Sequence, residues 1–310
     1  MSQASHVVII GGGIMGGDIA IIFAAKGWKV DVMSPSQKTR DALAARIAAG
    51  LSKINAPATH ASNVTAYARL EDIAWNDVSL VIEAATEDLA LKQKIFTQLD
   101  ALAKPDIALA TNTSNFPIGE VGKNLSARSR ARVIGLHFFM PAHLVPLVEI
   151  VSAESTDSAV AAHLEQLLKT LGKAPIRVNR DVPGFVGNRL QHALMREALW
   201  LIHDGITDAE GIDIAVRYGF GFRFVACGPI LQKEMSGLDT HYSVASALYP
   251  HLYKNDVPPP FLKAMNEKGH VGMKAKRGFW EWTDESIAQE KARIEKALQA
   301  GFAILEADKK

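Results

Sequence analysis

A histidine and a glutamate in two neighbouring apolar segments have side chains suited to proton transfer. His137 follows the apolar run 133–136, and Glu149 lies within the run 145–151. If the two runs form adjacent strands, the carboxylate can orient the imidazole and stabilise the imidazolium that forms when the ring takes a proton. A core histidine with a satisfied hydrogen bond would give the same pattern. The pair is therefore a candidate acid–base site.

A glycine-rich turn near the N-terminus is typical of dinucleotide-binding domains. The sequence GGGIMG at 11–16 directly follows a buried-strand run at 7–10 and precedes an Ala- and Ile-rich helical stretch. Gly11 permits the tight turn, Gly13 lets the backbone approach a pyrophosphate, and Gly16 allows close packing of helix and strand. A plain strand–turn–helix joint is the alternative. The residues expected to contact the cofactor here are Gly11, Gly13, Ile14, Met15 and Gly16.

The residue that ends the second predicted strand bears on the choice between NAD and NADP. An acidic residue ~20 positions beyond the glycines commonly binds the adenosine ribose, but Ser34 occupies that position here. Asp31 lies earlier in the strand, where its side chain need not face the ribose. Loss of the carboxylate removes the repulsion that would exclude a 2′-phosphate, which Lys38 or Arg40 can reach. We expect Ser34 to contact NAD, and NADP stays open.

Short apolar runs alternate with helical patterns in the first half of the chain. The runs fall at 7–10, 30–33, 80–84, 107–111, 133–138, 147–151 and 176–178, and the helical stretches at 14–26, 36–54, 89–103 and 158–171. This alternation predicts an α/β fold with a Rossmann-type, doubly wound parallel sheet. The strand ends would then meet at the edge where such folds bind ligands.

Beyond residue 178 the strand signals largely stop, and the chain is mostly helical to residue 305. The turn DVPG at 181–184 opens a long helical pattern. We therefore expect a boundary near residue 180, with an NAD(P)-binding Rossmann domain at 1–180 and a mostly α-helical C-terminal domain at 181–310. The second domain would contribute to substrate binding and dimerisation.

Composition excludes several other classes of function. The 310 residues contain 34 Lys and Arg against 33 Asp and Glu, so the chain lacks the field that steers proteins onto nucleic acid or anionic lipid. A single cysteine, Cys227, excludes a disulfide framework and multi-cysteine metal sites. No apolar run approaches the ~18 residues of a membrane span, and the N-terminus lacks a signal-peptide pattern. We expect a cytoplasmic protein with no nucleic-acid or membrane partner and no metal.

Six ordered motifs, spread over nearly the whole chain, resemble those of the L-3-hydroxyacyl-CoA dehydrogenase family. The sequence HFFMP at 137–141, followed by LVE at 147–149, is similar to the family signature His-Phe-Phe-Asn-Pro…Leu-Val-Glu. The other matching motifs are GGGIMG at 11–16, Glu83-Ala84 with Glu87 and Lys92, NTS at 112–114, DVPGFVGNRL at 181–190, and GLD at 237–239 with GMK at 272–274 and GFW at 278–280.

The resemblance implies roles for individual residues. His137 would take the proton of a substrate hydroxyl while a hydride passes to the nicotinamide, with Glu149 as its partner. Ser114 and Asn188 would hydrogen-bond the substrate oxygen, although both residue types equally suit turns and helix starts. The resemblance also implies homodimers formed through the C-terminal domain, whose apolar stripes the first domain cannot bury alone. The residues implied near the nicotinamide half are Glu87, Lys92, Ser114 and Lys274.

Three departures from the family pattern bear on the substrate. In acyl-CoA members of the family, a long lysine-rich helical hairpin contacts CoA. The matching segment of this chain, 44–64, is short and has one lysine, Lys53. Met140 replaces an asparagine beside the histidine, which makes the pocket less polar. The longer stretch 219–229 resembles the branch that oxidises small carboxylates, such as L-gulonate and pyridine-carboxylate dehydrogenases. Its Arg223 can pair with a substrate carboxylate, or with an acidic side chain of its own or a neighbouring subunit.

Together these features predict an NAD(P)-dependent oxidoreductase that acts on the secondary alcohol or ketone of a small 3-hydroxy acid or related carboxylate. One alternative keeps the chemistry but makes an L-3-hydroxyacyl-CoA, such as 3-hydroxybutyryl-CoA, the substrate. Another is a non-catalytic relative, comparable to the lens crystallins of this family. A purely structural role would not require His137, Glu149, Ser114 and Asn188 together.

Overall fold

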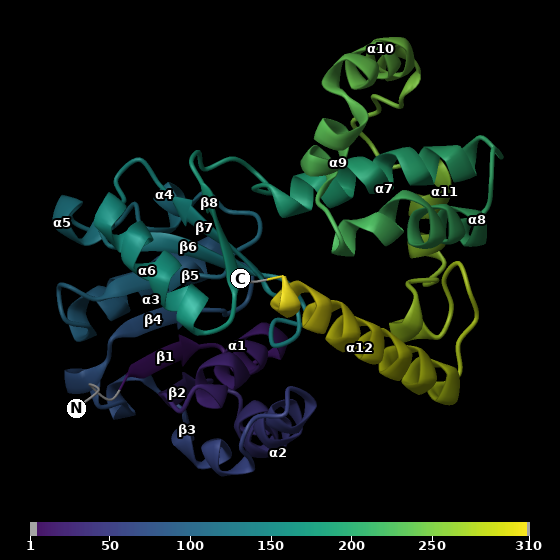
Figure 1. The fold of residues 1–310 in the computed structure, drawn as a ribbon. Coiled ribbons are helices and arrows are strands. Elements are labelled where there is room, and N and C mark those ends of the chain that lie inside the picture. Colours follow the sequence, from purple (N-terminus) through teal and green to yellow (C-terminus); the bar gives the residue numbers. More distant parts are fainter. Residues whose placement is uncertain (1–4, 309–310) are drawn as a thin grey trace. The chain divides into compact units, whose positions relative to one another are not determined.

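The computed structural model describes residues 5–308, which form two compact units dividing between Asn188 and Arg189 (Figure 1). Sequence patterns suggested a boundary near residue 180. The following segment belongs to the first unit because Phe185 is buried in its core, and the N–H groups of Val186 and Gly187 donate hydrogen bonds to Glu149.

The first unit is built on one eight-stranded sheet with the order β3-β2-β1-β4-β5-β6-β7-β8. The order confirms the predicted Rossmann-type sheet, since all neighbours are parallel except β6 and β7. Those two run antiparallel because residues 139–146 are too few for a crossover connection. The strands are β1 (His6–Ile10), β2 (Lys29–Met33), β3 (Val64–Tyr67), β4 (Leu80–Glu83), β5 (Ala108–Thr111), β6 (Val133–Phe138), β7 (Leu147–Ser152) and β8 (Ala174–Val178).

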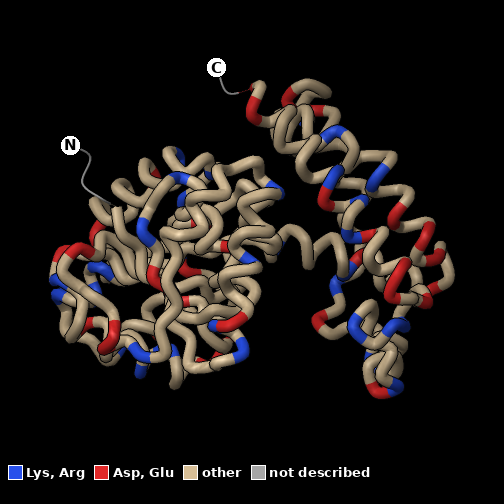
Figure 2. The backbone as a smooth tube through the Cα atoms, turned by 90° about the horizontal axis from the view of Figure 1, so that it is seen from below, with Lys and Arg blue, Asp and Glu red and all other residues tan. Residues whose placement is uncertain are grey.

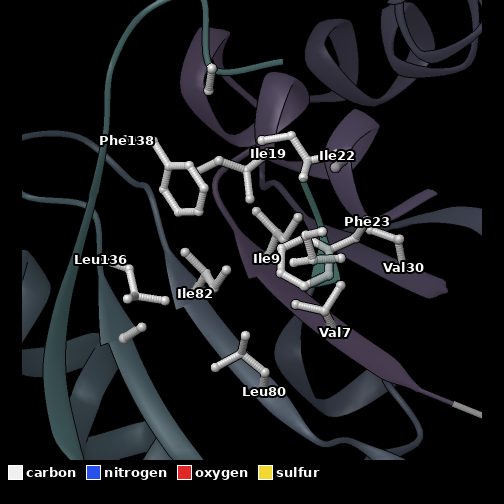
Figure 3. Packing of buried hydrophobic residues seen from close by; sticks show 14 of the residues in the cluster. Val7, Ile9, Ile19, Ile22, Phe23, Val30, Leu80, Ile82, Leu136 and Phe138 are labelled. Carbon is white, nitrogen blue, oxygen red and sulfur yellow. The ribbon is translucent and has the colours of Figure 1, made fainter. Parts of the chain in front are cut away.

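Helices cover both faces of this sheet, as continuous apolar strands require. Helices α1 (Ile14–Ala25), α2 (Gln37–Lys53) and α6 (Ser158–Thr170) bury one face, where Phe23 packs among side chains of β1 and β4 (Figure 3). On the other face lie α3 (Leu89–Leu102), α4 (Ile118–Val121), η2 (Leu70–Asp72) and η3 (Trp75–Asp77). Two further short elements, η1 (Ala58–Asn63) and α5 (Ala127–Arg130), complete the unit.

The second unit is helical, as predicted, and buries very few of its residues. Within its described part, only Ala198 and Pro259 are buried. Its elements are α7 (Gly187–His203), which begins in the first unit, α8 (Ala209–Ile214), η4 (Ala215–Phe220), η5 (Gly221–Val225), α9 (Pro229–Ser236), α10 (Leu238–Leu248), η6 (Tyr249–His251), α11 (Pro260–Glu267), η7 (Met273–Ala275) and α12 (Asp284–Ala307). A core this small indicates that the unit needs a further covering surface.

Charges of both signs alternate along the backbone of each unit (Figure 2). Among residues 5–308, no single helix has both the length and the apolar composition that crossing a membrane requires; one bent pair, Ala209–Val225 with Pro229–Ser236, passes on those two criteria alone.

Candidate active site

His137 and Glu149 are partners directly across the antiparallel pair β6–β7. His137 Nδ1 lies 2.7 Å from Glu149 Oε2, and both side chains are buried. The imidazole makes edge contacts with two aromatic rings, that of Phe139 at 4.6 Å and that of Phe185 at 5.5 Å between ring centroids. These contacts leave the imidazole little freedom to turn away from the carboxylate.

The second oxygen of Glu149 is held by the segment that leads into α7. Its Oε1 accepts the N–H groups of Val186 at 2.9 Å and Gly187 at 2.8 Å. Phe185 just before them has φ 48°, a left-handed conformation that costs a non-glycine residue free energy and persists at overdetermined sites. The strained backbone at Phe185 thus places the N–H groups of Val186 and Gly187 within hydrogen-bond distance of one buried oxygen of Glu149.

Burial and hydrogen bonding act in opposite directions on Glu149. Burial alone raises the pKa of this carboxyl, but the hydrogen bonds from His137, Gly187 and Val186 outweigh it, so the pKa lies below its ordinary value. The ionised carboxylate can only accept, which requires the proton of a neutral imidazole to be on Nδ1. His137 therefore keeps a lone pair on Nε2, the arrangement of a general base.

A second polar cluster lies at the carboxyl ends of β4 and β5. Buried Lys92 donates to both oxygens of Glu83, at 2.9 and 3.0 Å, and its Nζ lies 3.2 Å from Glu87 Oε2. Glu87 Oε1 in turn accepts the hydroxyl of Thr113 and, at 3.2 Å, the N–H of Ser114. The predicted residues Glu87, Lys92 and Ser114 are thus brought together, with Lys92 as the cation between two carboxylates.

The side chain of Asn112 ties this cluster to the strand that carries His137. Its Oδ1 accepts the N–H of Phe138 at 2.9 Å, which joins the end of β5 to the end of β6. Asn188 directly follows Gly187, whose N–H binds Glu149. Ser114 and Asn188 therefore lie in segments that are hydrogen-bonded to residues next to His137, namely Phe138 in the first case and Glu149 in the second.

The glycine turn has the shape that a dinucleotide needs. A Cβ on Gly11 would lie 2.5 Å from the carbonyl oxygen of Ala84, and one on Gly16 would lie 1.7 Å from that of Gly11. Both positions therefore require glycine for packing. A Cβ on Gly13 would meet nothing within 4 Å, so open space lies beside the backbone at the start of α1. A pyrophosphate approaching the N–H groups of Ile14 and Met15 fits this open position.

The end of β2 presents a serine and an arginine. Ser34 is buried next to Gly12, and its carbonyl accepts a hydrogen bond from Arg40 Nη1 at 2.6 Å. Asp31 is fully buried and paired with His6, whose Nε2 lies 2.9 Å from its Oδ2. Asp31 is therefore committed inside the sheet and is unable to bind a ribose.

Three charged residues near the glycine turn were not singled out from the sequence. Asp18 is buried in α1, Arg46 of α2 bonds to its carboxylate, and Lys173 is buried just before β8. Arg46 also lies in segment 44–64, so this segment has a second cation besides Lys53. A lone carboxylate in an otherwise apolar helix was the signal that could have drawn attention to Asp18.

The remaining predicted residues, Arg223 and Lys274, belong to the second unit. Both side chains are exposed, Arg223 in η5 and Lys274 in η7. Within the described part of the chain, Arg223 forms no ion pair with an acidic side chain. An apolar cavity of about 1080 Å³ in the same unit, walled by Phe279, Trp280 and Trp282, includes neither residue. Among residues 5–308, no cluster of His, Cys, Asp and Glu could hold a metal ion.

Comparison with known proteins agrees with this geometry. Residues 6–182 match the model of the family described as 3-hydroxyacyl-CoA dehydrogenase, NAD binding domain, and residues 184–282 match the 3-hydroxyacyl-CoA dehydrogenase C-terminal domain. The chain belongs to the 3-hydroxyacyl-CoA dehydrogenase family. The predicted family, the NAD-dependent oxidoreductase class and the cofactor NAD are thereby confirmed.

Individual relatives divide between two kinds of named substrate. The chain is 30% identical over 305 residues, covering 97% of it and 98% of the relative, to 5-formyl-3-hydroxy-2-methylpyridine 4-carboxylate 5-dehydrogenase of Mesorhizobium japonicum. It is 36% identical over 296 residues, covering 90% of it and 99% of the relative, to 3-hydroxybutyryl-CoA dehydrogenase of Mycobacterium tuberculosis.

A crystal structure of a dehydrogenase named for the same pyridine carboxylic acid, described as an NAD+ dependent dismutase, superimposes on the chain with a TM-score of 0.88. It is 29% identical, and the match covers 99% of both chains.

Proposed function

We propose that this protein oxidises the alcohol, or reduces the ketone, of a small carboxylate-bearing molecule, with His137 as the general base and acid. The observation that carries the proposal is the buried, ionised Glu149, which binds His137 Nδ1 and two backbone N–H groups at once. That arrangement leaves His137 Nε2 as the proton acceptor. A histidine kept only for packing would not require a desolvated carboxylate to fix its tautomer.

In the forward direction His137 Nε2 takes the proton of the substrate hydroxyl, and Glu149 stabilises the imidazolium that forms. General acid–base catalysis of this kind contributes roughly 10²–10⁴-fold in rate. Ser114 and Asn188 donate hydrogen bonds to the substrate oxygen as it becomes a carbonyl. The glycine turn and Ser34 would hold NAD, which would supply the hydride acceptor. In the reverse direction His137 returns the proton to the oxygen.

Two observations favour a free carboxylate over a CoA thioester. Arg46, one of two cations in segment 44–64, has its guanidinium committed to carbonyls and Asp18 inside the unit, so it is not available to CoA phosphates. Arg223 has no acidic partner within the described chain and can form a bidentate pair with a substrate carboxylate. The pyridine-carboxylate relative, matched over nearly its full length, supports the same substrate class.

The second candidate substrate is an L-3-hydroxyacyl-CoA such as 3-hydroxybutyryl-CoA. The relative named for that activity is the more identical of the two, at 36%. This candidate is supported by overall sequence similarity, whereas the free-acid proposal is supported by the partners of Arg46 and by the lack of an acidic partner for Arg223 within the described chain.

A substrate panel distinguishes the two. Free 3-hydroxy acids, sugar acids and pyridine carboxylates are assayed with NAD and with NADP, in parallel with 3-hydroxybutyryl-CoA and acetoacetyl-CoA. We expect turnover of a free carboxylate with NAD, and loss of that turnover in Arg223→Gln. A strong preference for the thioesters, unchanged in Arg223→Gln, would contradict the proposed substrate class.

The exposed apolar surface of the second unit supports a homodimer. Large apolar side chains with about three quarters of their surface exposed include Phe222 at 74%, Ile230 at 75%, Met235 at 77% and Tyr242 at 76%. Burial of each such side chain stabilises an interface by about 1.5–3 kcal/mol, and large exposed patches mark interaction sites. Light scattering tests the proposal, and a monodisperse monomer at micromolar concentration would contradict it.

A further inference from the structure

Arg46 holds two peptide groups at the start of α1. Its Nη1 donates to the carbonyl of Gly13 at 2.8 Å, and its Nη2 donates to the carbonyl of Ile14 at 2.5 Å. In a planar trans peptide the C=O and the following N–H point in opposite directions. Fixing these two carbonyls therefore fixes the N–H groups of Ile14 and Met15 at the start of α1, the end of the helix where Gly13 leaves open space.

The same contact strengthens those N–H groups as donors. The carbonyl of Gly13 already accepts the helical hydrogen bond from Gly17 at 2.9 Å. A guanidinium that donates to a carbonyl polarises the peptide, and hydrogen bonds that form a chain through one peptide strengthen one another. Arg46 thus prepares the start of α1 for an anion without contacting the anion itself.

Asp18 connects Arg46 to a different part of the fold. Its Oδ1 accepts Arg46 Nη2 at 2.7 Å, and its Oδ2 accepts the N–H of Ala142 at 3.0 Å. Ala142 lies in the connection 139–146 between β6 and β7. His143 Nδ1, at 3.4 Å from Oδ1, adds a further nearby group. A buried carboxylate requires such partners because its desolvation is costly.

Lys173 binds the carbonyl group of the same residue, Ala142. Its buried ammonium donates to the carbonyl of Ala142 at 2.6 Å and to that of Val145 at 3.0 Å. Ala142 is thereby fixed through both its N–H and its C=O. The connection starts directly after Phe138, and Phe139 within it packs on the ring of His137 at 4.6 Å.

We propose that Arg46, Asp18 and Lys173 are positioning residues that hold the phosphate-facing start of α1 in fixed register with the connection that packs on His137. The inference rests on the proposed function, in which NAD binds at the glycine turn and His137 is the base. Arg46 acts at the cofactor end and Lys173 at the catalytic end, and Asp18 joins the two. Hydride transfer requires such register, because misplacement by about 1 Å can cost on the order of 10²-fold in rate.

Arg132 provides a matched control within the same unit. Its Nη1 donates to the carbonyls of Lys104 at 2.7 Å and Ile107 at 3.1 Å, and its Nη2 donates to Asp100 Oδ1 at 2.6 Å. It is a buried arginine with the same kinds of partner, but it precedes β6 and so lies at the opposite end of that strand from His137.

The experiment compares Arg46→Gln, Asp18→Asn and Lys173→Met with the control Arg132→Gln. Each variant is measured for the NADH dissociation constant by fluorescence, for kcat at saturating NAD, and for the urea midpoint of unfolding. We expect Arg46→Gln to weaken NADH binding about tenfold, in line with the loss of charged hydrogen bonds. Lys173→Met should keep the NADH dissociation constant within about twofold and lower kcat about tenfold. Asp18→Asn should show both effects.

A purely structural network would lower the urea midpoint without this division of effects. Unchanged NADH binding in Arg46→Gln, or the same kinetic losses in Arg132→Gln, would overturn the proposal. If Asp18→Asn fails to fold, the other two variants still decide. The connection 139–146 can also be followed without substrate, because the NMR resonances of the His137 ring in labelled protein sense the ring current of Phe139. Lys173→Met should shift these resonances, and Arg132→Gln should not. Inactivity of the parent across the panel would reject the proposed function and leave these binding and resonance results standing.

Discussion

Glu149 accepts the Nδ1–H of His137 directly across the strand pair β6–β7, at 2.7 Å, while its other oxygen is held by two backbone N–H groups. The carboxylate is fully buried and has three donors, so it is fixed in both position and charge.

Replacing the base should remove turnover and leave cofactor binding intact. We expect His137→Ala to lower kcat by roughly 10²–10⁴-fold, the range for loss of general acid–base catalysis. The hydrogen bond and the ring contacts of the imidazole are made with Glu149, Phe139 and Phe185, so the NADH dissociation constant should stay within about twofold. Steady-state kinetics and fluorescence titration measure the two quantities. Full activity in this variant would exclude His137 as the base.

Glu149→Gln should place the imidazole proton on the wrong nitrogen. The amide can still accept the N–H groups of Val186 and Gly187 through its oxygen, but its NH₂ then faces Nδ1. The ring is forced to carry its proton on Nε2 and loses its basic lone pair toward the substrate. We expect a loss in kcat of roughly 10²–10⁴-fold. Nitrogen chemical shifts of labelled His137 report the tautomer, and an unchanged tautomer would contradict this explanation.

Glu149 should also contribute stability that depends on acid pH. Its pKa is lower in the folded chain than its ordinary value, because hydrogen bonds from His137, Gly187 and Val186 outweigh the effect of burial. The stabilisation is therefore present above the unfolded pKa, ~4.3, and is lost as pH falls through the folded value. The difference in unfolding free energy between parent and Glu149→Gln should shrink on acidification below about pH 4.

Alanine substitutions at two glycines of the same turn should have different effects, one on stability and the other on cofactor binding. Gly16→Ala places a Cβ 1.7 Å from the carbonyl of Gly11, and we expect destabilisation of at least about 2 kcal/mol. Gly13→Ala meets no atom within 4 Å, so unfolding should change by no more than about 1 kcal/mol. Its methyl group occupies the space of the pyrophosphate, however, and NADH should bind at least about tenfold more weakly. Normal NADH binding in Gly13→Ala would argue against a cofactor at this position.

Lys173 should make the folded state more stable at alkaline pH. Burial lowers the pKa of this ammonium to about 8, against an opposing effect of Asp18. The unfolded chain, with a lysine pKa of ~10.4, binds the proton more tightly, so folding is penalised by about 3 kcal/mol below pH 8. The penalty is relieved as pH rises from about 8 to about 10. Urea unfolding across this range should show a steeper rise for the parent than for Lys173→Met, and parallel curves would contradict it.

Elements with a strong apolar pattern were predictable, and the exceptions have physical reasons. Strand β3 was missed because its four residues VTAY lie at the sheet edge and are partly exposed, which removes the continuous apolar run. The antiparallel direction of β7 could not be derived from composition, since strands of either direction buried on both faces look alike. The short connection 139–146 was the available signal.

The His137–Glu149 pair was predictable, whereas the network around Asp18 was not. Register partners on adjacent strands follow from two apolar runs and a short connection. The contacts of Arg46 and Lys173 are to backbone carbonyls of distant segments, and any residue supplies a carbonyl. No pattern of residue types therefore indicates such partners before the fold is known.

The bonds from Val186 and Gly187 to Glu149 lie at the point where the chain enters α7, the helix that continues into the second unit. Each of these donors lowers the pKa of the Glu149 carboxyl, because a hydrogen bond from a backbone N–H favours the ionised form. A substitution that shifts the first turn of α7 and breaks these bonds therefore raises that pKa toward its ordinary value. The carboxylate that orients His137 thus depends on backbone positions in the segment that leads out of the first unit.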